Sequence, residues 1–429
     1  MKYNKKTLKD VIVKHKKVIL RLDLNVPLEN GIITDTKRID ASLKTLNYLI
    51  KNKSKVIILS HLGRIESLED IKSGKKSLDI VAKKLQELLP KTKVFFERSN
   101  INKDLLKLIN DDAKFPYGSI VLLENTRYND IDKNGKLVKL ESKNDEKLAK
   151  FWASLGDVFV NDAFGTCHRE HASNAGIAKN IKTSCIGFLV ENELKKLSKL
   201  IDTNKKPYIS ILGGAKVQDK IKMIEKIVKI SDKLIIVGAM AHPFLYEQGY
   251  DMGGYVKNVN NEMFAKKLLK KYGDKIYLPI DVIATDNFKN PKIIKTCLLK
   301  DGISENLIPV DIGPKTIKNI EKILKNAKVI FWNGPSGIFE IDQFSKGTIG
   351  ICKLISKRTK LKAYTVIGGG DSATAAKKFG FENNFSFIST GGGASISFIQ
   401  GDSLLGLKNI ENVKINKTSK KLLKNINGI

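Results

Sequence analysis

The stretch AYTVIGGGDSATAAKKFG, residues 363–380, decides how the rest of the chain is interpreted. It begins with an apolar, β-branched run, passes through glycines at 368–370 and continues into a segment rich in alanine and lysine. Strand, glycine turn and helix in this order are typical of an α/β unit. Glycines let backbone N–H groups approach a phosphate, and a helix N-terminus favours an anion. Asp371 could hold a nucleotide-bound magnesium ion, and the Ser372 hydroxyl could cap the helix or contact phosphate.

Two further segments repeat this order of strand, glycine loop and helix. GGGAS at 391–395 and GGAK at 213–216 each follow an apolar run. Three such loops in one half of the chain predict a nucleotide site. The sequence has neither GxGxxG nor GxxxxGK[ST], so a standard dinucleotide fold and a P-loop are not predicted. Lys216 and Lys220 stand four residues apart, where two ammonium groups would suit a polyphosphate; the alternative is two surface lysines.

Outside these loops, apolar runs alternate with amphipathic stretches along the whole chain. In the first half the runs end in Asp, Asn, His or Arg, as in KVILRLDLN (17–25) and KVIILSH (55–61); in the second they end in glycine, as in PYISILGG (207–214). Continuous apolar strands separated by helices indicate parallel sheets covered on both faces, which bind ligands at the carboxyl ends of their strands. We expect an α/β fold of two doubly wound domains, each with a mainly parallel β-sheet flanked by helices, joined by a hinge.

The expected domain boundaries follow from this change in chemistry. FLVENELKKLSKLID at 188–202 has a helical pattern and separates the two halves. We expect an N-terminal domain over 1–187, the segment 188–202 as a hinge helix, and a C-terminal domain over 203–406. Residues 407–429 are rich in Lys and Asn with one acidic residue, Glu411, and predict a solvated basic tail.

The chain of 429 residues carries a formal net charge of +31. Basic surfaces that bind nucleic acid are clustered and often interleaved with aromatic residues. Here lysines run through nearly every helix-like segment, which favours a compositional bias toward lysine on solvated helix faces. No run of about 18 apolar residues occurs, so neither a membrane span nor a secretory signal is expected. The four cysteines are scattered without a CxxC pair, which disfavours a zinc ribbon or disulfide framework and favours a reducing, cytoplasmic compartment.

Only seven of the 76 basic residues are arginines. In a chain so rich in lysine, a retained guanidinium indicates a site that needs its planar, bidentate geometry. Each arginine alone could serve a salt bridge, but five follow apolar runs or their turns, near His61, His168 and His171, and together predict an anion pocket for phosphate or carboxylate. These five are Arg21, Arg38, Arg64, Arg127 and Arg169. CHREH at 167–171 lacks the spacing of a zinc site, and His242 carries no readable role.

The combination of segments resembles the phosphoglycerate kinase family. Over residues 11–406 the chain carries, in that family's order, VILRLDLNVP, SHLGR, LLENTR, DVFVNDAFGTCHREHASN, LGGAKVQDKI, DIGPKT, FWNGPSGIFE, TVIGGGDSA and STGGGAS. The resemblance implies a hinged two-domain phosphotransferase with a carboxyl group as acceptor, which converts ATP and 3-phosphoglycerate reversibly into ADP and 1,3-bisphosphoglycerate. It implies Mg²⁺ bound with the nucleotide. We expect these small molecules as partners, no specific nucleic acid, no membrane, and a monomer.

The resemblance also implies roles for single residues. The expected phosphoglycerate site in the first domain is lined by Asp23, Leu24, Asn25, Arg38, His61, Leu62, Gly63, Arg64, Arg127 and Arg169, with Arg21 close by. The expected nucleotide site in the second domain comprises Gly213, Lys220, Asn333, Glu340, Gly369, Gly370, Asp371 and Ser372, with Asp371 as the metal ligand. Arg38 and Lys216 would be the catalytic residues, facing the transferring group from opposite domains after hinge closure.

The chain departs from the family pattern, mainly near the expected base pocket. Ile65 follows HLGR where the family usually has Pro, GGGMA reads VGAMA at 237–241, and PVD places Pro309 where a glycine usually contacts the nucleotide. These changes leave phosphate binding intact and leave base selectivity and nucleotide affinity open. The competing functions are a nucleic-acid or acidic-surface binder, which the dispersed lysines disfavour, and an NAD-linked dehydrogenase, which the missing GxGxxG disfavours.

Overall fold

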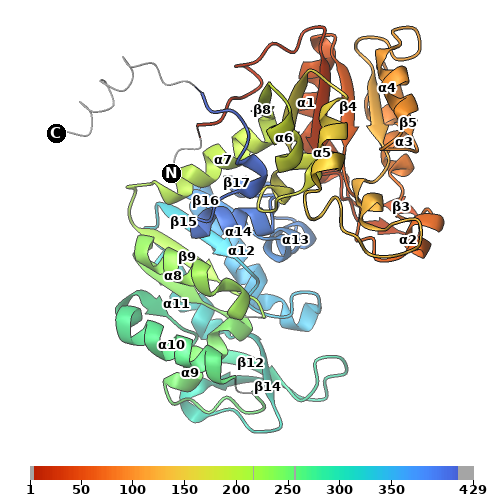
Figure 1. Ribbon diagram of the computed structural model, residues 1–429. Helices are drawn as coiled ribbons and strands as arrows, with labels where there is room; N and C mark the ends of the chain where they lie inside the picture. Colours follow the sequence, from red (N-terminus) through yellow and green to blue (C-terminus); the bar gives the residue numbers. More distant parts are fainter. Residues whose placement is uncertain (1–3, 216, 256–257, 414–429) are drawn as a thin grey trace, which may run out of the picture. The chain divides into compact units, whose positions relative to one another are not determined.

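The computed structural model describes residues 4–215, 217–255 and 258–413, which divide into two compact units (Figure 1). The first unit is built from the described residues up to Lys195 and from Ser403 onward, and the second from Lys196–Asp402. The prediction of an α/β fold with two domains is confirmed. Among the described residues, no helix combines the length and the apolar character needed to cross a membrane.

A six-stranded parallel sheet of order β5-β6-β4-β1-β7-β8 forms the centre of the first unit. Its strands are β1 (Lys17–Leu22), β4 (Lys55–Leu59), β5 (Val94–Glu97), β6 (Ile120–Leu123), β7 (Val158–Asp162) and β8 (Ser184–Ile186). A small antiparallel hairpin joins β2 (Leu28–Glu29) to β3 (Ile32–Ile33). Every residue of β4, β6 and β7 is buried, so both faces of the sheet are covered, as the continuous apolar runs predict.

Helices supply the cover in the first unit. They are α1 (Lys37–Lys51), α2 (Leu68–Lys72), α3 (Asp79–Leu88), α4 (Lys103–Asn110), α5 (Glu146–Ala153), α6 (Ile177–Asn180) and the first part of α7 (Phe188–Ile201). One core joins the apolar stripes of α1 and α3, including Leu46 and Leu85, to strand residues such as Leu20 of β1. This packing is the main source of helix stability, because isolated helices of this length are marginal in water.

The second unit has its own six-stranded parallel sheet, of order β11-β10-β9-β15-β16-β17. Its strands are β9 (Tyr208–Leu212), β10 (Lys233–Ile236), β11 (Ile276–Tyr277), β15 (Val329–Asn333), β16 (Tyr364–Gly368) and β17 (Phe387–Ile388). A separate antiparallel sheet of order β13-β12-β14 comprises β12 (Asp281–Thr285), β13 (Ile294–Leu298) and β14 (Ile308–Ile312). The apolar run KIYLPIDV (275–282) is divided between the two sheets, because Pro279 has no N–H to continue the β11 ladder.

The helices of the second unit pack against this framework. They are α8 (Ile221–Ile230), α9 (His242–Glu247), α10 (Val259–Tyr272), α11 (Pro314–Leu324), α12 (Lys346–Lys360), α13 (Gly370–Lys378) and α14 (Gly393–Gln400). Its core combines Trp332 of β15 with Ile320 of α11 and Ile351 of α12. Each unit therefore has a separate hydrophobic core.

Helix α7 contains the boundary between the units, between Lys195 and Lys196. The segment predicted as a hinge helix is thus helical, and its action as a hinge stays a prediction. Asp162, at the end of β7, starts this helix: its Oδ1 accepts hydrogen bonds from the backbone N–H groups of Leu189 (2.8 Å) and Val190 (3.0 Å). A carboxylate at this position satisfies first-turn donors and complements the helix dipole.

The predicted boundary after residue 406 differs from the structure. Residues 403–413 belong to the first unit, where Asn161 Nδ2 donates to the Gly406 carbonyl (3.0 Å) and Asn409 Nδ2 to the Ala175 carbonyl (3.0 Å). Ile410 is only 2% exposed. The segment up to residue 413 is therefore packed rather than a solvated tail, because it is hydrogen-bonded to the first unit and its apolar residues Leu404, Leu407 and Ile410 are buried. Residues 414–429 lie outside the described residues.

Truncating Ile410 provides a test of this assignment. Ile410→Ala should lower the free energy of unfolding of the first unit by about 2–4 kcal/mol, because it removes a buried side chain and leaves a cavity. The chain has two tryptophans, Trp152 in the first unit and Trp332 in the second, so urea unfolding can be followed by fluorescence in Trp332→Phe and Trp152→Phe backgrounds. A shift confined to the Trp332 signal would contradict the assignment of the segment to the first unit.

Candidate functional site

The carboxyl ends of four neighbouring strands of the first unit carry the predicted anion-binding residues. Asp23, Leu24 and Asn25 follow β1, His61–Arg64 follow β4, Arg127 follows β6, and Arg169 follows β7. These strands are adjacent in the order β6-β4-β1-β7 and run parallel, so their carboxyl ends share one edge of the sheet.

Gly63 is the point at which several of these segments are joined. Its N–H donates to Asn25 Oδ1 (2.7 Å), and its carbonyl accepts from Arg127 Nη1 (2.6 Å). The neighbouring Leu62 carbonyl accepts from Asn125 Nδ2 (2.8 Å), and the Leu24 N–H donates to Ser60 Oγ (2.9 Å). The loops after β1, β4 and β6 therefore form one hydrogen-bonded unit, in which each contact joins a backbone group to a specific polar side chain.

Arg38 lies in the first turn of α1 and forms an ion pair with Asp23. Its side chain keeps 35% exposure, while that of Asp23 keeps 11%. The Asp23 Oδ1 atom is buried without a hydrogen-bond partner among the described residues. The carboxylate thus fixes one side of the guanidinium and leaves its outer side open to a ligand.

Arg21, in β1, is fully buried, and its guanidinium contacts the side chains of Ser173 and His61. Its Nε donates to Ser173 Oγ (2.7 Å), and its Nη2 lies 3.3 Å from His61 Nδ1. Burial lowers the pKa of His61 well below its ordinary value, and the positive charges of Arg21 and Arg127 lower it further. His61 is therefore neutral at physiological pH, and its Nδ1 can accept from Arg21.

Glu141 is the buried counter-charge of this network. Its two carboxylate oxygens accept from Ser173 Oγ (2.6 Å) and from the Ser173 N–H (3.0 Å). Burial raises the pKa of Glu141, whereas Arg21 and the bonds from Ser173 lower it. Sequence reasoning missed Glu141 and Ser173. Glu141 lies in a loop with no motif, so no local signal marks it as the partner of an arginine 120 positions earlier.

Arg64 and Arg169 are exposed members of the predicted set. Arg169 Nε donates to His168 Nε2 (3.0 Å). Arg169 also lies near enough to Arg127 to lower its pKa, after burial, which is the larger cause. No described residue forms a hydrogen bond or ion pair with the Arg64 side chain. The structure thus brings Arg127 and Arg169 together, whereas the Arg64 side chain is exposed and makes no hydrogen bond or ion pair with a described residue.

The corresponding edge of the sheet in the second unit is formed by glycine loops. Gly213 follows β9 and Gly334 follows β15, and a Cβ at either position would collide with the backbone of the other loop. Lys220 Nζ donates to the Gly213 carbonyl (2.8 Å). Asn333, at the end of β15, contacts the strand ends on both sides. Its carbonyl accepts from the N–H of Gly213, after β9 (2.9 Å), and its Nδ2 donates to the carbonyl of Gly368, at the end of β16 (2.7 Å).

The loop after β16 leads into α13. Gly369 has φ of +91°, a left-handed conformation that favours glycine, and it precedes the first turn of the helix. A Cβ at Gly370 would meet no atom within 4 Å, so space is open beside the helix N-terminus. Asp371 is exposed there. The Ser372 hydroxyl, predicted to contact phosphate, is instead buried and accepts from the Gly334 N–H (2.5 Å).

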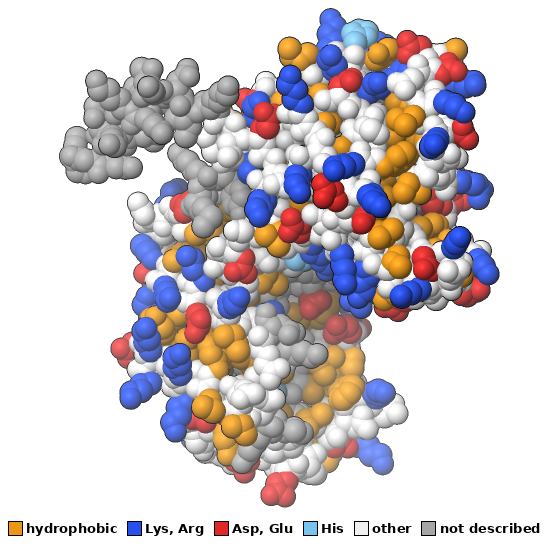
Figure 2. Space-filling model, viewed as in Figure 1, with side chains coloured by type: hydrophobic (Ala, Val, Ile, Leu, Met, Phe, Trp, Pro, Cys, Tyr) orange, Lys and Arg blue, Asp and Glu red, His pale blue; other side chains and the backbone are white. Residues whose placement is uncertain are grey.

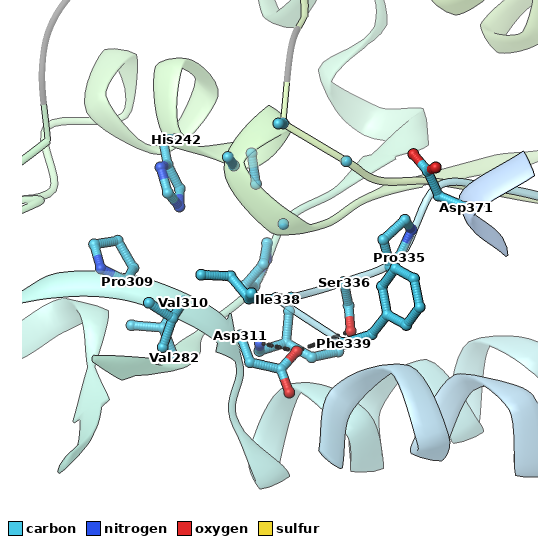
Figure 3. A pocket seen from close by; sticks show the side chains of 18 of the residues that line it. His242, Val282, Pro309, Val310, Asp311, Pro335, Ser336, Ile338, Phe339 and Asp371 are labelled. Carbon is cyan, nitrogen blue, oxygen red and sulfur yellow. Dashed lines mark hydrogen bonds between the residues drawn. The ribbon is translucent and has the colours of Figure 1, made fainter. Parts of the chain in front are cut away.

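A cavity of about 320 Å³ lies beside these loops (Figure 3). Gly214 and Glu340 line it, and Asp371 and His242 lie at opposite ends in Figure 3. Pro309, the departure noted in the sequence, forms part of the wall. Much of the lining is apolar, which is typical of a small-molecule site with a few polar groups that orient the ligand.

Asp311 is a buried carboxylate in the cavity wall. Its oxygens accept from Ser336 Oγ (2.9 Å), the Ile312 N–H (2.9 Å) and the Gly347 N–H (2.6 Å). Burial nevertheless raises the pKa of Asp311 to about 7, against the effect of these bonds. The carboxylate holds β14 to the loop after β15 and to the start of α12, so it shapes the cavity from behind.

Within the described ranges, no group of three or more His, Cys, Asp or Glu side chains could hold a metal ion. Asp371 is an exposed carboxylate beside an open helix N-terminus, and Mg²⁺ in nucleotide sites needs only one or two carboxylates in addition to phosphate oxygens. The donor chemistry of this end of the cavity therefore fits a magnesium nucleotide. Lys216, predicted as catalytic, lies outside the described residues.

The Lys and Arg side chains are distributed over the visible face of each unit, interspersed with acidic and uncharged groups (Figure 2). This distribution on the visible face agrees with lysine-coated, solvated helices. The basic residues that meet at a strand edge of the first unit are the exception, because they converge on one point from several segments.

Comparisons with known proteins agree with the resemblance seen in the sequence. Residues 8–402 match the family model described as phosphoglycerate kinase. The phosphoglycerate kinase of Malacoplasma penetrans is 51% identical over 416 residues, covering 96% of this chain and 87% of that protein, and that of Mycoplasma genitalium is 48% identical over 412 residues, covering 95% and 99%. The structure of phosphoglycerate kinase from Coxiella burnetii matches with a TM-score of 0.81 at 35% identity, covering 95% of this chain and 98% of that one.

The titration of Asp311 predicts a pH-dependent stability of the second unit. An unperturbed Asp carboxyl, as in the unfolded chain, has a pKa of 3.8, whereas the pKa of Asp311 in the folded protein is about 7. Between these two pH values the unfolded chain releases a proton that the folded protein keeps. Wild-type stability therefore falls as the pH rises through this range, and that of Asp311→Asn does not. The difference in unfolding free energy should move in favour of the variant by roughly 2–4 kcal/mol, measured by urea unfolding with Trp332 fluorescence in a Trp152→Phe background. A difference independent of pH would contradict the raised pKa.

Proposed function

The chain belongs to the phosphoglycerate kinase family, and from that premise we propose how its residues carry the phosphoryl transfer. It is a phosphotransferase with a carboxyl acceptor, which moves a phosphoryl group between ATP and 3-phosphoglycerate in the ATP-forming part of glycolysis. The observation that carries the proposal is the contrast between the two strand edges: the first unit presents cationic side chains, and the second presents glycine loops beside a cavity.

The acid substrate would bind at the strand edge of the first unit. Arg38 supports this role because its guanidinium is held by Asp23 yet stays partly exposed. Arg127 is half-buried and fixed by the Gly63 carbonyl, and Arg169 lies beside it. Guanidinium groups bind carboxylate and phosphate oxygens through two parallel hydrogen bonds, which fixes the orientation of a small anion as well as its position. The other predicted members of this site are Leu24, Asn25, His61, Leu62 and Arg64.

The nucleotide would bind in the second unit. Its phosphates would lie near Gly213, Lys220 and the N-terminus of α13, where a glycine loop and a helix dipole favour an anion. Its ribose and base would occupy the cavity, with the exposed Glu340 as an acceptor for a ribose hydroxyl. Asp371 would hold the magnesium ion of the nucleotide, which neutralises phosphate charge when bound. Asn333, Gly369, Gly370 and Ser372 would support this site through the loops that they connect.

Phosphoryl transfer at this site requires positioning and charge stabilisation more than covalent chemistry. The attacking carboxylate of 3-phosphoglycerate is already ionised at neutral pH, so no general base is needed. Arg38 and Lys216 would neutralise the equatorial oxygens of the transferring group from the two domains. In-line transfer requires the two substrates to meet, so the proposal includes a step in which the units bring them together and exclude water, with α7 as the hinge.

The decisive test is a coupled assay for ADP formation from MgATP and 3-phosphoglycerate by the purified full-length protein. Turnover that depends on both substrates and on magnesium is the expected result. A folded protein without turnover would overturn the assignment. We also propose that the protein acts in the cytoplasm as a monomer on these small molecules, which fractionation and light scattering can test.

Replacing Lys216 tests the proposed charge stabilisation. Lys216→Ala should lower kcat by about 10²-fold or more, because one positioned charge that stabilises the transition state is lost. The matched control is Lys222→Ala, which removes an exposed lysine of α8 and should leave kcat unchanged. Steady-state kinetics with both substrates saturating give the comparison. Equal kcat in wild type and Lys216→Ala would remove Lys216 from this role.

Replacing Arg38 by lysine separates guanidinium geometry from charge. Arg38→Lys keeps the positive charge beside Asp23 but loses the bidentate fork, so kcat/KM for 3-phosphoglycerate should fall by about 10-fold or more. Arg358→Lys in α12 is the control, since its Nη2 donates to the Ala327 carbonyl within the second unit. Wild-type kinetics for Arg38→Lys would mean that charge alone suffices at this position.

A further inference from the structure

We propose that His242 is a base-recognition residue of this protein, whose imidazole hydrogen-bonds to the edge of the nucleotide base at the apolar end of the cavity in the second unit. This inference rests on the proposed nucleotide site and adds the group that discriminates between bases. It concerns a residue to which neither the sequence pattern nor the phosphate chemistry assigns a role.

The position of His242 is the first support. The residue opens α9, directly after the short 3₁₀ turn Gly238–Ala241 that follows β10. Figure 3 shows its ring projecting from the helix into the cavity toward Pro309, away from the end that carries Asp371. If the phosphates lie at the Asp371 end, the base lies toward His242. The cavity wall includes the apolar residues Leu245, Pro279, Val282, Pro309, Val310 and Ile338.

The hydrogen-bonding capacity of the ring is the second support. Among residues 4–215, 217–255 and 258–413, none hydrogen-bonds or ion-pairs with the His242 ring. The ring is nevertheless held, because it packs edge-on against Tyr255 with a centroid distance of 5.6 Å and an interplanar angle of 80°. The Tyr255 hydroxyl donates in turn to Glu262 Oε1 (3.5 Å). His242 is thus a fixed polar group whose nitrogens are available to a ligand.

The protonation state of His242 suits recognition of a base rather than of a phosphate. Burial lowers the pKa of His242 to about 4, so the ring is neutral at physiological pH. A neutral imidazole carries one donor and one acceptor. It therefore matches the mixed donor and acceptor edge of a nucleobase and offers no charge to a phosphate.

Other polar groups of the cavity are engaged elsewhere. Asp311 accepts from Ser336 Oγ and from the backbone N–H groups of Ile312 and Gly347, so it is engaged within the protein. Glu340 and Asp371 are exposed, and in the proposed site they serve the ribose and the magnesium ion. Pro309 contributes no N–H to the wall, so this part of β14 cannot donate to a base from its backbone. Discrimination between bases at the apolar end is then made by His242. A base whose edge has the wrong donor or acceptor leaves a polar group that has lost its water without a hydrogen-bond partner, which costs affinity.

The experiment compares nucleotides in wild type and His242→Phe. Phenylalanine keeps the ring against Tyr255 and removes both nitrogens. Calorimetric titration with MgADP, MgGDP and MgCDP should show that the ratios of Kd between bases change by about 3–10-fold in the variant, the loss of one hydrogen bond. Binding of magnesium pyrophosphate, which lacks a base, should be unchanged. The KM for 3-phosphoglycerate should also stay at its wild-type value, because this substrate would bind in the first unit.

Two further variants separate recognition from packing. Val282→Ala removes apolar wall without a polar group, so it should weaken all three nucleotides by a similar factor and leave their ratios unchanged. His242→Gln keeps a donor and an acceptor, and should retain part of the wild-type preference even if His242→Phe folds poorly. Thermal unfolding of each variant checks that its fold is intact.

Unchanged Kd ratios in both His242→Phe and His242→Gln, with nucleotides still bound, would overturn the inference and leave the proposed function standing. Wild-type protein that binds no nucleotide would overturn the nucleotide site and the inference with it. A uniform loss of affinity for MgADP, MgGDP, MgCDP and magnesium pyrophosphate in His242→Phe would assign His242 a packing role and likewise overturn base recognition.

Discussion

Parallel pairing of strands is the constraint on which the rest of this structure depends. Because neighbouring strands run in the same direction, their carboxyl ends meet at one edge, and the loops that follow them are brought together whatever their separation in the chain. In the first unit, the register that pairs Arg21 with Leu59 on one side and with Asn161 on the other places three distant loops side by side. In the second unit, the same rule joins the glycine loops after β9 and β15.

Buried charges then position the groups that this edge exposes. Arg21 is removed from solvent and compensated by Glu141 through Ser173, and in this arrangement it faces His61. Removing a charge from water is costly unless it is paired and hydrogen-bonded, so such a network tolerates few alternative geometries. In the second unit, the buried Asp311 has a comparable role beside the cavity. It accepts from three backbone or side-chain donors and so fixes the position of the cavity wall.

In the proposed sites, the two units would bind anions through different groups. The first uses guanidinium side chains, which suit a small acid whose orientation matters. The second uses loops in which a side chain would collide, together with a helix N-terminus, which suit the longer phosphate chain of a nucleotide. This division explains why arginines mark one half of the sequence and glycine clusters the other. The net charge of +31 contributes little to either site, because most of it is lysine spread over helix faces.

The sequence by itself determined the α/β class, most of the strands, and the chemistry at most strand ends, including Arg127 and the glycine loop at 368–370. These are local properties: periodicity, turn residues and strand-end side chains lie within a few positions of one another. Only the tertiary structure decided that the segment from residue 403 returns to the first unit, that Glu141 compensates Arg21, and that His242 enters the cavity. Such pairings join residues far apart in the chain, and they depend on how complete sheets, helices and loops pack, which no short pattern records.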